Sequence, residues 1–549
     1  MATIAAAVVA MGRLGFSLGL FGHPLLASLL GRSPKMRREA TAIISALAIT
    51  CMAGAADGDP LAGSNPPGEM AAIPTGFFAP NMTGLPDALS LPALPAFRAD
   101  ATTTPAPSAP GPLDALGVSW QNQNLLGDMW GLRPALGNYG LTLTILENIE
   151  TFGNLTGGVQ QGWEADGLTT VTLQMDTEKA FGLKGGTFNV SGLQVWGGDL
   201  TANNLLVLQT LTDIEAPVGV RLWELWYQQK FGDKFDVKIG EQSLDEEFTI
   251  APTANSFFLS AMSGWPGVPT IDLPGGGPAY PLAGLGVRGR VQVTDSVTAL
   301  AGVFNGSPIP RNSPNVPESN PHGVSFPLDT GTLAIAELQY AYGSSASGKP
   351  SSDSPLPGVY KIGAWYDSYK FNDQQYDAIG LPLASPLSNG DPAQHHGDFS
   401  LYGVIDQMIW LSKDNTNRSV NVFVRPMFTP YQDRNLVSAS INAGFALKAP
   451  LPTRDNDFFG VEMGTVWATS GASNFDRQMQ FFQPSVYTPV RSSETFIEAS
   501  YQFQVVPSWV IQPDVQYFIN PGMGIANPDD PTQRIKNEFV VGLRTNINF

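Results

Sequence analysis

The sequence contains one cysteine, Cys51, among 549 residues, so no disulfide can form within the chain. Only 14% of its residues are charged, and 48 acidic residues outnumber 30 basic ones, which gives a formal net charge of −18. This balance argues against nucleic acid as a partner and against a basic anchor on a membrane surface. Because no internal disulfide is possible, the stability of the fold must come from backbone pairing and packing.

Long apolar runs are missing after the N-terminal region. No stretch there approaches the roughly 18 to 20 consecutive apolar residues that a membrane helix needs, so a helical membrane protein is not expected. Histidine is scarce as well, with four in the chain. His395 and His396 lie beside Asp391 and Asp398 in an expected external loop, but adjacent side chains of an extended segment point to opposite faces. We expect no metal site, no cofactor and no catalytic residues.

The N-terminus is typical of an export signal, and residues 1–55 are predicted to be a leader. Arg37 and Arg38 precede an apolar stretch that ends in the small residues of Ala53–Ala55. The apolar run before them makes the leader long, so Met36 is an alternative start. Cys51 could instead carry a lipid, but Ala48-Ile49-Thr50 fit a lipidation motif poorly, which favours a bystander cysteine in a discarded signal.

A composition change separates the leader from the rest of the chain. Residues 56–117 are rich in Pro, Ala, Thr and Gly, as in ATTTPAPSAPGP, and show no periodicity. This segment is predicted to be a disordered linker. The remaining residues, 118–549, form the expected folded domain.

Alternation of apolar and polar residues dominates that domain. In WELWYQQKF, Trp223, Leu225 and Tyr227 occupy one face, while Glu224 and Trp226 occupy the other. After the short turn GDK, FDVKIGEQ continues the same pattern, which predicts an antiparallel hairpin. The C-terminal GLRTNINF alternates in the same way and ends on Phe549.

Sixteen segments follow this pattern, and the connections between them alternate between short and long. The predicted strands are 140–150, 167–178, 186–196, 217–230, 235–244, 284–294, 297–305, 332–341, 358–369, 398–411, 419–428, 436–447, 458–469, 493–504, 509–519 and 534–549. Short connections such as 231–234 and 505–508 then fall at one end, and long ones such as 245–283 and 470–492 at the other.

Strands of about ten residues match a tilted crossing of a bilayer, whereas a soluble sandwich usually has strands of about five or six. A closed barrel also leaves no sheet edge exposed to lipid. We therefore predict an all-β fold: a transmembrane antiparallel β-barrel of about 16 strands, with long extracellular loops and short periplasmic turns, in a Gram-negative outer membrane after export through the periplasm. The terminal Phe549 is similar to the signal that such proteins present to the barrel insertion machinery.

Several sequence segments carry a more specific resemblance. They are RLWELWYQQKF, VKIGEQSLDEEF, GWPGVPTIDLPGGGPAYPLAGLGVR, GVFNGSPIP, AELQYAYG, YKIGAWYDS, RPMFTPYQDRNL, PVRSSETFIEASYQFQ and GLRTNINF. From about Trp120 to Phe549 the chain resembles the carbohydrate-selective porins of the OprB type. The resemblance implies passive uptake of neutral monosaccharides and polyols, such as glucose, through a water-filled pore, without ATP or a cofactor.

The alternation also predicts which side chains face the lumen. A neutral sugar needs polar groups that exchange hydrogen bonds with hydroxyls, and aromatic faces for its C–H surface. The pore-lining and sugar-binding candidates are Glu224, Trp226, Gln228, Gln242, Arg288, Arg290, Trp365, Asp367, Arg425 and Glu498. The favoured constriction combines Glu224, Arg288, Arg290 and Arg425 with Trp226 or Trp365. Alternatively, these charges form a ladder that stiffens the wall.

The long connection 245–283 supplies further constriction candidates, because SLDEEF contains Asp245, Glu246 and Glu247. The Gly- and Pro-rich IDLPGGGPAYP suggests a compact loop that turns inward and narrows the pore. The alternative is an acidic loop in the external solvent. At the level of function, the alternatives are a general non-selective porin, an outer-membrane enzyme and a secreted carbohydrate-binding β-protein.

Overall fold

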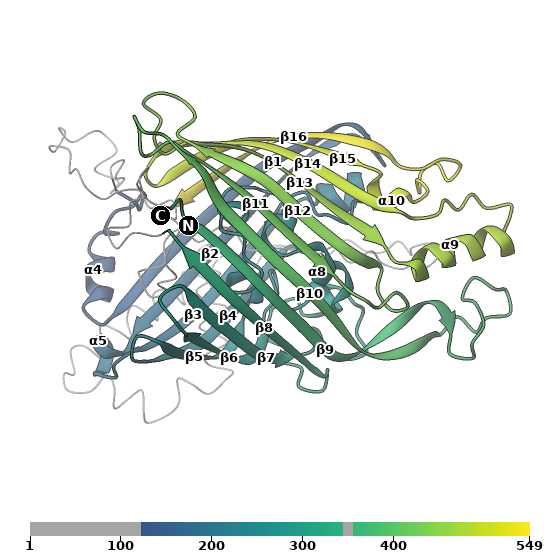
Figure 1. The fold of residues 1–549 in the computed structure, drawn as a ribbon, viewed down its shortest axis with the longest axis horizontal. Helices are drawn as coiled ribbons and strands as arrows, with labels where there is room; N and C mark the ends of the chain where they lie inside the picture. Colours follow the sequence, from purple (N-terminus) through teal and green to yellow (C-terminus); the bar gives the residue numbers. More distant parts are fainter. Residues whose placement is uncertain (1–121, 344–354) are drawn as a thin grey trace, which may run out of the picture.

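The computed structural model describes residues 122–343 and 355–549, and these form one closed antiparallel β-barrel (Figure 1). Sixteen strands are present in these ranges, and each pairs with its neighbour in sequence, while β1 pairs with β16 to close the cylinder. The predicted fold class is confirmed. The predicted leader and linker lie outside the described residues. In the described part of the chain, no helix is long and apolar enough to cross a membrane.

Within the described residues, the strands are β1 Leu141–Gly158, β2 Gly162–Asp176, β3 Gly186–Gly197, β4 Gly219–Phe231, β5 Phe235–Gln242, β6 Gly284–Gln292, β7 Val297–Asn305, β8 Thr332–Tyr342, β9 Gly358–Asp377, β10 Pro392–Leu411, β11 Ser419–Phe428, β12 Val437–Lys448, β13 Phe458–Ala468, β14 Ser493–Val506, β15 Trp509–Ile519 and β16 Lys536–Asn548. The helices are α4 Leu132–Gly137, α5 Thr177–Phe181, η2 Thr201–Leu205, η3 Leu244–Glu246, α6 Pro252–Asn255, α7 Ala261–Gly264, α8 Gly267–Asp272, η4 Pro274–Gly276, η5 Pro317–Ser319, α9 Ser470–Phe482 and α10 Pro521–Gly524.

Burial follows the alternation of the sequence along most strands. On β8, Ile335 and Glu337 are buried in the interior, whereas Leu338 and Tyr340 are exposed on the outer wall. Because successive side chains of a strand point to opposite faces, the outer face becomes apolar and the inner face polar. Tyr342 and Tyr360 stack on this outer wall with ring centroids 5.9 Å apart, as in the aromatic belt at a membrane surface.

The predicted strands agree closely with the observed ones, and β7, β11 and β15 have the predicted bounds. β1, β9 and β10 are longer than expected, with 18, 20 and 20 residues, and β2 begins at Gly162 rather than at 167. His395 and His396 therefore lie on β10, and their placement in an external loop was wrong. His395 Nε2 lies 2.7 Å from Asp373 Oδ2 on β9. The cause is strand pairing that continues to Asp377 and Pro392, although the alternation of the sequence weakens there.

Trp223 departs from the predicted alternation. Instead of facing outward, it is fully buried and packs edge-on against Tyr280, with ring centroids 6.4 Å apart. The register between β3 and β4 shifts between Ser191 and Gly192, which leaves Trp223 as an extra residue on β4. A β-bulge of this kind reverses which face a side chain occupies. The prediction for Trp223 was therefore wrong, whereas Glu224 faces inward as expected.

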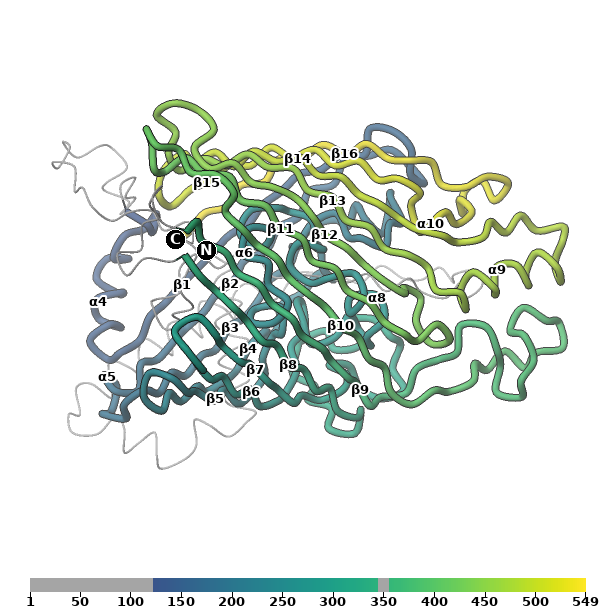
Figure 2. Tube along the Cα trace, in the orientation of Figure 1, coloured from purple at the N-terminus to yellow at the C-terminus, as the bar shows by residue number. Residues whose placement is uncertain are grey.

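The two ends of the barrel differ. α4, α5 and the C-terminus lie at one end, and α9 and the projecting β9–β10 hairpin lie at the other (Figure 1). The connections at the first end include the three residues between β4 and β5 and the two between β14 and β15. The β5–β6 loop, residues 243–283, starts at the opposite end and turns into the barrel, where Figure 2 shows α6 and α8 behind the wall strands.

A second connection, the β3–β4 loop of residues 198–218, lies beside the β5–β6 loop. The backbone N–H of Asp213 donates to Leu259 O at 2.8 Å, and Tyr280 Oη donates to Ile214 O at 3.0 Å. Apolar side chains of both loops pack with inward residues of the wall in one large cluster, which includes Leu211, Phe258 and Phe496. This cluster gives the loops a fixed position inside the cylinder.

Candidate pore constriction

The first turn of the β5–β6 loop meets a group of charged side chains from β5 and β6. Glu247 of the loop pairs with Lys238 of β5 and Arg288 of β6, whose Nη2 lies 2.9 Å from Glu247 Oε1. Arg288 also pairs with Asp236, and Arg290 Nη1 lies 3.7 Å from the same carboxylate. Burial would raise the pKa of Glu247, but Lys238 and Arg288 outweigh this and lower it to about 2.

Residues of β4 extend this group along the wall. The ammonium group of Lys238 lies 4.4 Å from the ring centroid of Trp226, and the indole N–H donates to Glu224 Oε2 at 3.1 Å. Glu224 Oε1 accepts from the backbone N–H of Ser243, where the loop begins, at 3.1 Å. Gln228 Nε2 donates to Asp236 Oδ1 at 2.9 Å. We refer to Glu224, Trp226, Gln228, Asp236, Lys238, Glu247, Arg288 and Arg290 as the root cluster.

The other two acidic candidates of the loop also lie at its start. Burial raises the pKa of Asp245 to about 6, although the carboxylate accepts from Ser243 Oγ and from the backbone N–H of Tyr280. Burial, together with the charges of Asp245 and Glu224, raises the pKa of Glu246 well above its usual value. The loop therefore begins with one carboxylate whose pKa is lowered and two whose pKa values are raised by burial.

The tip of the same loop is fastened to the opposite wall. Arg425 on β11 donates to three backbone carbonyls, those of Thr249, Met262 and Gly264. On β14, the carboxylate of Glu498 accepts from the backbone N–H groups of Leu259 and Ser260 at 2.8 and 2.9 Å. Both side chains are fully buried. These two candidates therefore hold the loop across the lumen, well apart from the root cluster.

Further inward residues, absent from the predicted set, hold the loop as well. Glu337 of β8 accepts from the backbone N–H of Thr249 at 2.8 Å, and Asp406 of β10 accepts from that of Thr253 at 2.6 Å. Glu462 of β13 accepts from the hydroxyl of Ser263. Each is a single acid within an apolar strand segment, as in VIDQM and GVEMG. That isolated charge at an inward position is the signal that could have identified them.

The β3–β4 loop is fastened by a separate set of residues. Glu494 of β14 accepts from the backbone N–H groups of Leu208 and Gln209, at 3.0 and 2.8 Å. Arg544 of β16 pairs with Asp213 of the loop and with Glu150 of β1. Burial raises the pKa of Asp213 to about 7, although the charge of Arg544 opposes this shift. The alternation along the strands does not predict that this loop turns inward.

The remaining candidates lie inside the barrel but outside the root cluster. Gln242 Nε2 donates to Gly286 O at 3.0 Å, next to the start of the loop. Trp365 is buried on β9, and Asp367, two residues along the same strand, accepts from the backbone N–H of Tyr369 at 2.9 Å. The structure therefore brings Glu224, Trp226, Gln228, Glu247, Arg288 and Arg290 together, and it places Arg425 and Glu498 on the far wall.

This arrangement suits the passage of neutral polar solutes more than that of ions. In the root cluster each carboxylate of Asp236 and Glu247 is matched by nearby Lys or Arg groups, so opposite charges largely cancel. Amide groups and an indole ring accompany them. Within the described residues, no group of three or more His, Cys, Asp or Glu side chains is arranged to hold a metal ion.

A sixteen-strand barrel with an apolar outer wall, a polar inner wall and a loop fixed across its lumen is the architecture of an outer-membrane porin. The model of the family "Carbohydrate-selective porin, OprB family" matches residues 160–549. The chain belongs to this family, which makes it a channel of the Gram-negative outer membrane rather than an enzyme. The predicted family and location are confirmed.

Individual relatives agree with this assignment. The chain is 22% identical over 439 residues to "Porin B" of Pseudomonas aeruginosa, covering 76% of this chain and 90% of that protein. It is 23% identical over 449 residues to "Putative porin QuiX" of Acinetobacter baylyi, covering 78% and 94%. The solved structure of Pseudomonas putida OprB at high pH superposes with a TM-score of 0.66 at 20% identity, covering 78% of this chain and 99% of that one. This structural similarity, at 20% sequence identity, shows that the two proteins share a fold.

Proposed function

We propose that this porin carries neutral monosaccharides and polyols of the glucose type passively from the exterior to the periplasm. The observation that carries the proposal is the root cluster, where paired charges, amides and the indole ring of Trp226 line the wall at the start of the inward loop. All but one of the side chains in the root cluster are less than 10% exposed, so a sugar hydroxyl would meet chiefly Arg290, whose side chain is 11% exposed beside Asp236. Binding must stay weak enough for release.

Liposome swelling tests the solute class directly. Purified protein reconstituted into liposomes should admit glucose or a pentose faster than an amino acid of similar size, and faster than a disaccharide, which is larger. Protein-free liposomes and liposomes with a heat-denatured sample serve as controls. Equal rates for all small solutes would reduce the protein to a general non-selective porin.

The constriction is proposed to lie at the root cluster, with Arg290 and Glu224 as the residues to test. Arg290 carries a positive charge beside Asp236, and Glu224 holds both the indole of Trp226 and the first residue of the loop. Replacement of either with Ala should change the single-channel conductance or the block by glucose. If both variants kept the wild-type single-channel conductance and the wild-type block by glucose, the constriction would lie elsewhere.

We also propose that the C-terminal strand is read by the barrel insertion machinery through Phe549. The backbone N–H of Phe549 donates to Ile145 O at 2.9 Å, and its ring joins a small apolar cluster around Ile145 and Val171. Arg133, in the first turn of α4, donates to the main-chain oxygen of Phe549. The residue thus lies at the β1–β16 seam, where the last strand closes the cylinder.

A further inference from the structure

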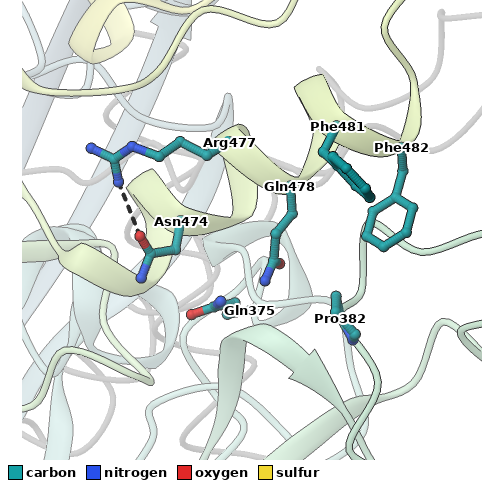
Figure 3. Close-up of a pocket in the computed structure, with 7 residues that line it drawn as sticks. All are labelled: Gln375, Pro382, Asn474, Arg477, Gln478, Phe481 and Phe482. Carbon is teal, nitrogen blue, oxygen red and sulfur yellow. Dashed lines mark hydrogen bonds between the residues drawn. The ribbon is translucent and has the colours of Figure 1, made fainter.

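A groove lies beyond the barrel, between α9 and the tip of the β9–β10 hairpin (Figure 3). Its volume of about 400 Å³ falls in the range of roughly 300 to 1,000 Å³ that is usual for small-molecule sites. It is lined by Gln375, Pro382, Asn474, Arg477, Gln478, Phe481 and Phe482. None of these residues belongs to the root cluster.

The lining combines amide groups with aromatic rings. Gln375 and Gln478 face the space between the helix and the hairpin, and the rings of Phe481 and Phe482 lie at one end of it (Figure 3). The two rings pack edge-to-face with centroids 5.0 Å apart, yet Phe481 remains 78% exposed. An exposed aromatic ring beside polar groups can pack against the apolar face of a ligand while those groups bind its polar edge.

One polar atom of the groove lacks a partner. The side-chain Oε1 of Gln478 is buried, and no hydrogen bond to it is formed by any residue in the described ranges. Buried polar atoms in folded proteins nearly always have a hydrogen-bond partner, because leaving one unpaired costs free energy. A ligand hydroxyl would become the missing donor once the Gln478 amide rotates to turn this oxygen toward the groove.

The groove is held in shape by contacts at the start and in the middle of α9 and by contacts within the hairpin. At its start, Gly471 N donates to Gln432 O at 3.0 Å, and a Cβ on Gly471 would lie 2.4 Å from that oxygen. Further along, Arg491 pairs with Asp476 at 2.8 Å. On the hairpin side, Leu383 N donates to Gln375 O at 2.9 Å. A preformed site loses less conformational entropy when a ligand binds to it.

We propose that this groove binds a single sugar ring at the extracellular mouth of the porin. A sugar presents C–H faces, which suit the rings of Phe481 and Phe482, and a rim of hydroxyls, which suit the amides and the guanidinium group of Arg477. A purely apolar ligand would leave the Gln478 oxygen unpaired. The role of the groove as a capture site that raises the sugar concentration at the mouth rests on the proposed function, whereas the binding itself does not.

Saturation-transfer NMR with D-glucose and the full-length protein in detergent micelles tests the proposal. Phe481→Ala and Gln478→Ala should each weaken glucose binding by roughly tenfold, as expected for the loss of one aromatic or one buried polar contact. Tyr487→Ala is the matched control, because Tyr487 is an exposed aromatic residue of the same connection that does not line the groove. The glucose affinity of the Tyr487→Ala variant should equal that of the wild type.

Wild-type affinity in both groove variants would overturn the proposal, and so would an equal loss in Tyr487→Ala. Liposome swelling at saturating glucose separates this result from the proposed transport function. Phe481→Ala should swell liposomes at the wild-type rate, since the ring lies outside the barrel. A loss of binding in a porin without sugar preference would support the groove and contradict the proposed selectivity.

Discussion

Arg288 and Glu247 form a buried ion pair between the barrel wall and the β5–β6 loop, across 41 residues of sequence. The side chains are 0% and 9% exposed, and Arg288 bonds Asp236 at the same time. The chain thus returns to its own wall immediately after leaving β5. This contact sets the direction in which the loop enters the lumen.

Arg288→Gln should loosen this attachment and leave Glu247 without one of its two cationic partners. Breaking a buried pair by removing one partner costs about 3 to 5 kcal/mol. We expect a lower temperature of barrel unfolding, measured by heat-modifiable gel mobility, and noisier or larger single-channel currents in planar bilayers.

The matched control is Arg311→Gln, because Arg311 is 46% exposed and lies 4.0 Å from Asp329. Surface pairs of this kind contribute about 0 to 1 kcal/mol. If both variants had the same unfolding temperature and the same current noise, the Arg288–Glu247 pair would have no role in fixing the loop.

Glu498 offers a second test, directed at the loop tip. Glu498→Ala leaves the buried N–H groups of Leu259 and Ser260 without their acceptor, at about 1 to 3 kcal/mol for each. Glu498→Gln retains one acceptor oxygen and should recover part of the loss. The order of unfolding temperatures is therefore expected to be wild type, then Gln, then Ala. Identical values for Gln and Ala would contradict hydrogen bonding as the cause.

Asp245 gives a pH-dependent prediction. Because burial raises its pKa from 3.8 to about 6, the folded protein binds this proton more tightly than the unfolded chain does. The resulting stabilisation is complete below about pH 4 and is lost as the pH rises through about 6. Asp245→Asn, which mimics the neutral acid, should therefore show a flatter dependence of unfolding temperature on pH between 4 and 7. If the curves of unfolding temperature against pH ran parallel for the wild type and Asp245→Asn, the raised pKa of Asp245 would be refuted.

Phe549 can be tested in cells. Deletion of Phe549 should reduce the amount of heat-modifiable barrel in the outer-membrane fraction, whereas Phe549→Tyr, which keeps an aromatic end, should assemble normally. Leu451→Ala, a change at an exposed residue in the turn between β12 and β13, controls for general effects of mutation. Normal assembly after the deletion would remove Phe549 from the proposed signal.

The sequence could predict the barrel because period-two alternation is a local property of each strand. β7, β11 and β15 were predicted to the residue, and the inward positions of Arg425 and Glu498 follow from the same count. The alternation gives the wrong face for Trp223 because a single extra residue on β4 turns the side chain inward. Nothing in WELW indicates that extra residue, since it arises from pairing with β3.

The roles of the inward residues could not be read from the strands alone. Arg425 donates to carbonyls of residues more than 160 positions away, so its partners depend on the path of a loop that has no periodicity. The inward turn of 198–218 was missed for the same reason. Alternation places a side chain in the lumen, but only the tertiary fold shows whether it meets water or another segment of the chain.

The wall of the barrel is uneven in height, with strands of 8 or 9 residues at β5 and β6 and of 20 residues at β9 and β10. The tall side projects at the same end as α9 and carries the β9–β10 hairpin, whose connecting turn ends at Asp391. The low side, in turn, lets the β5–β6 loop leave its strands well below the crest, deep enough to reach across the middle of the channel.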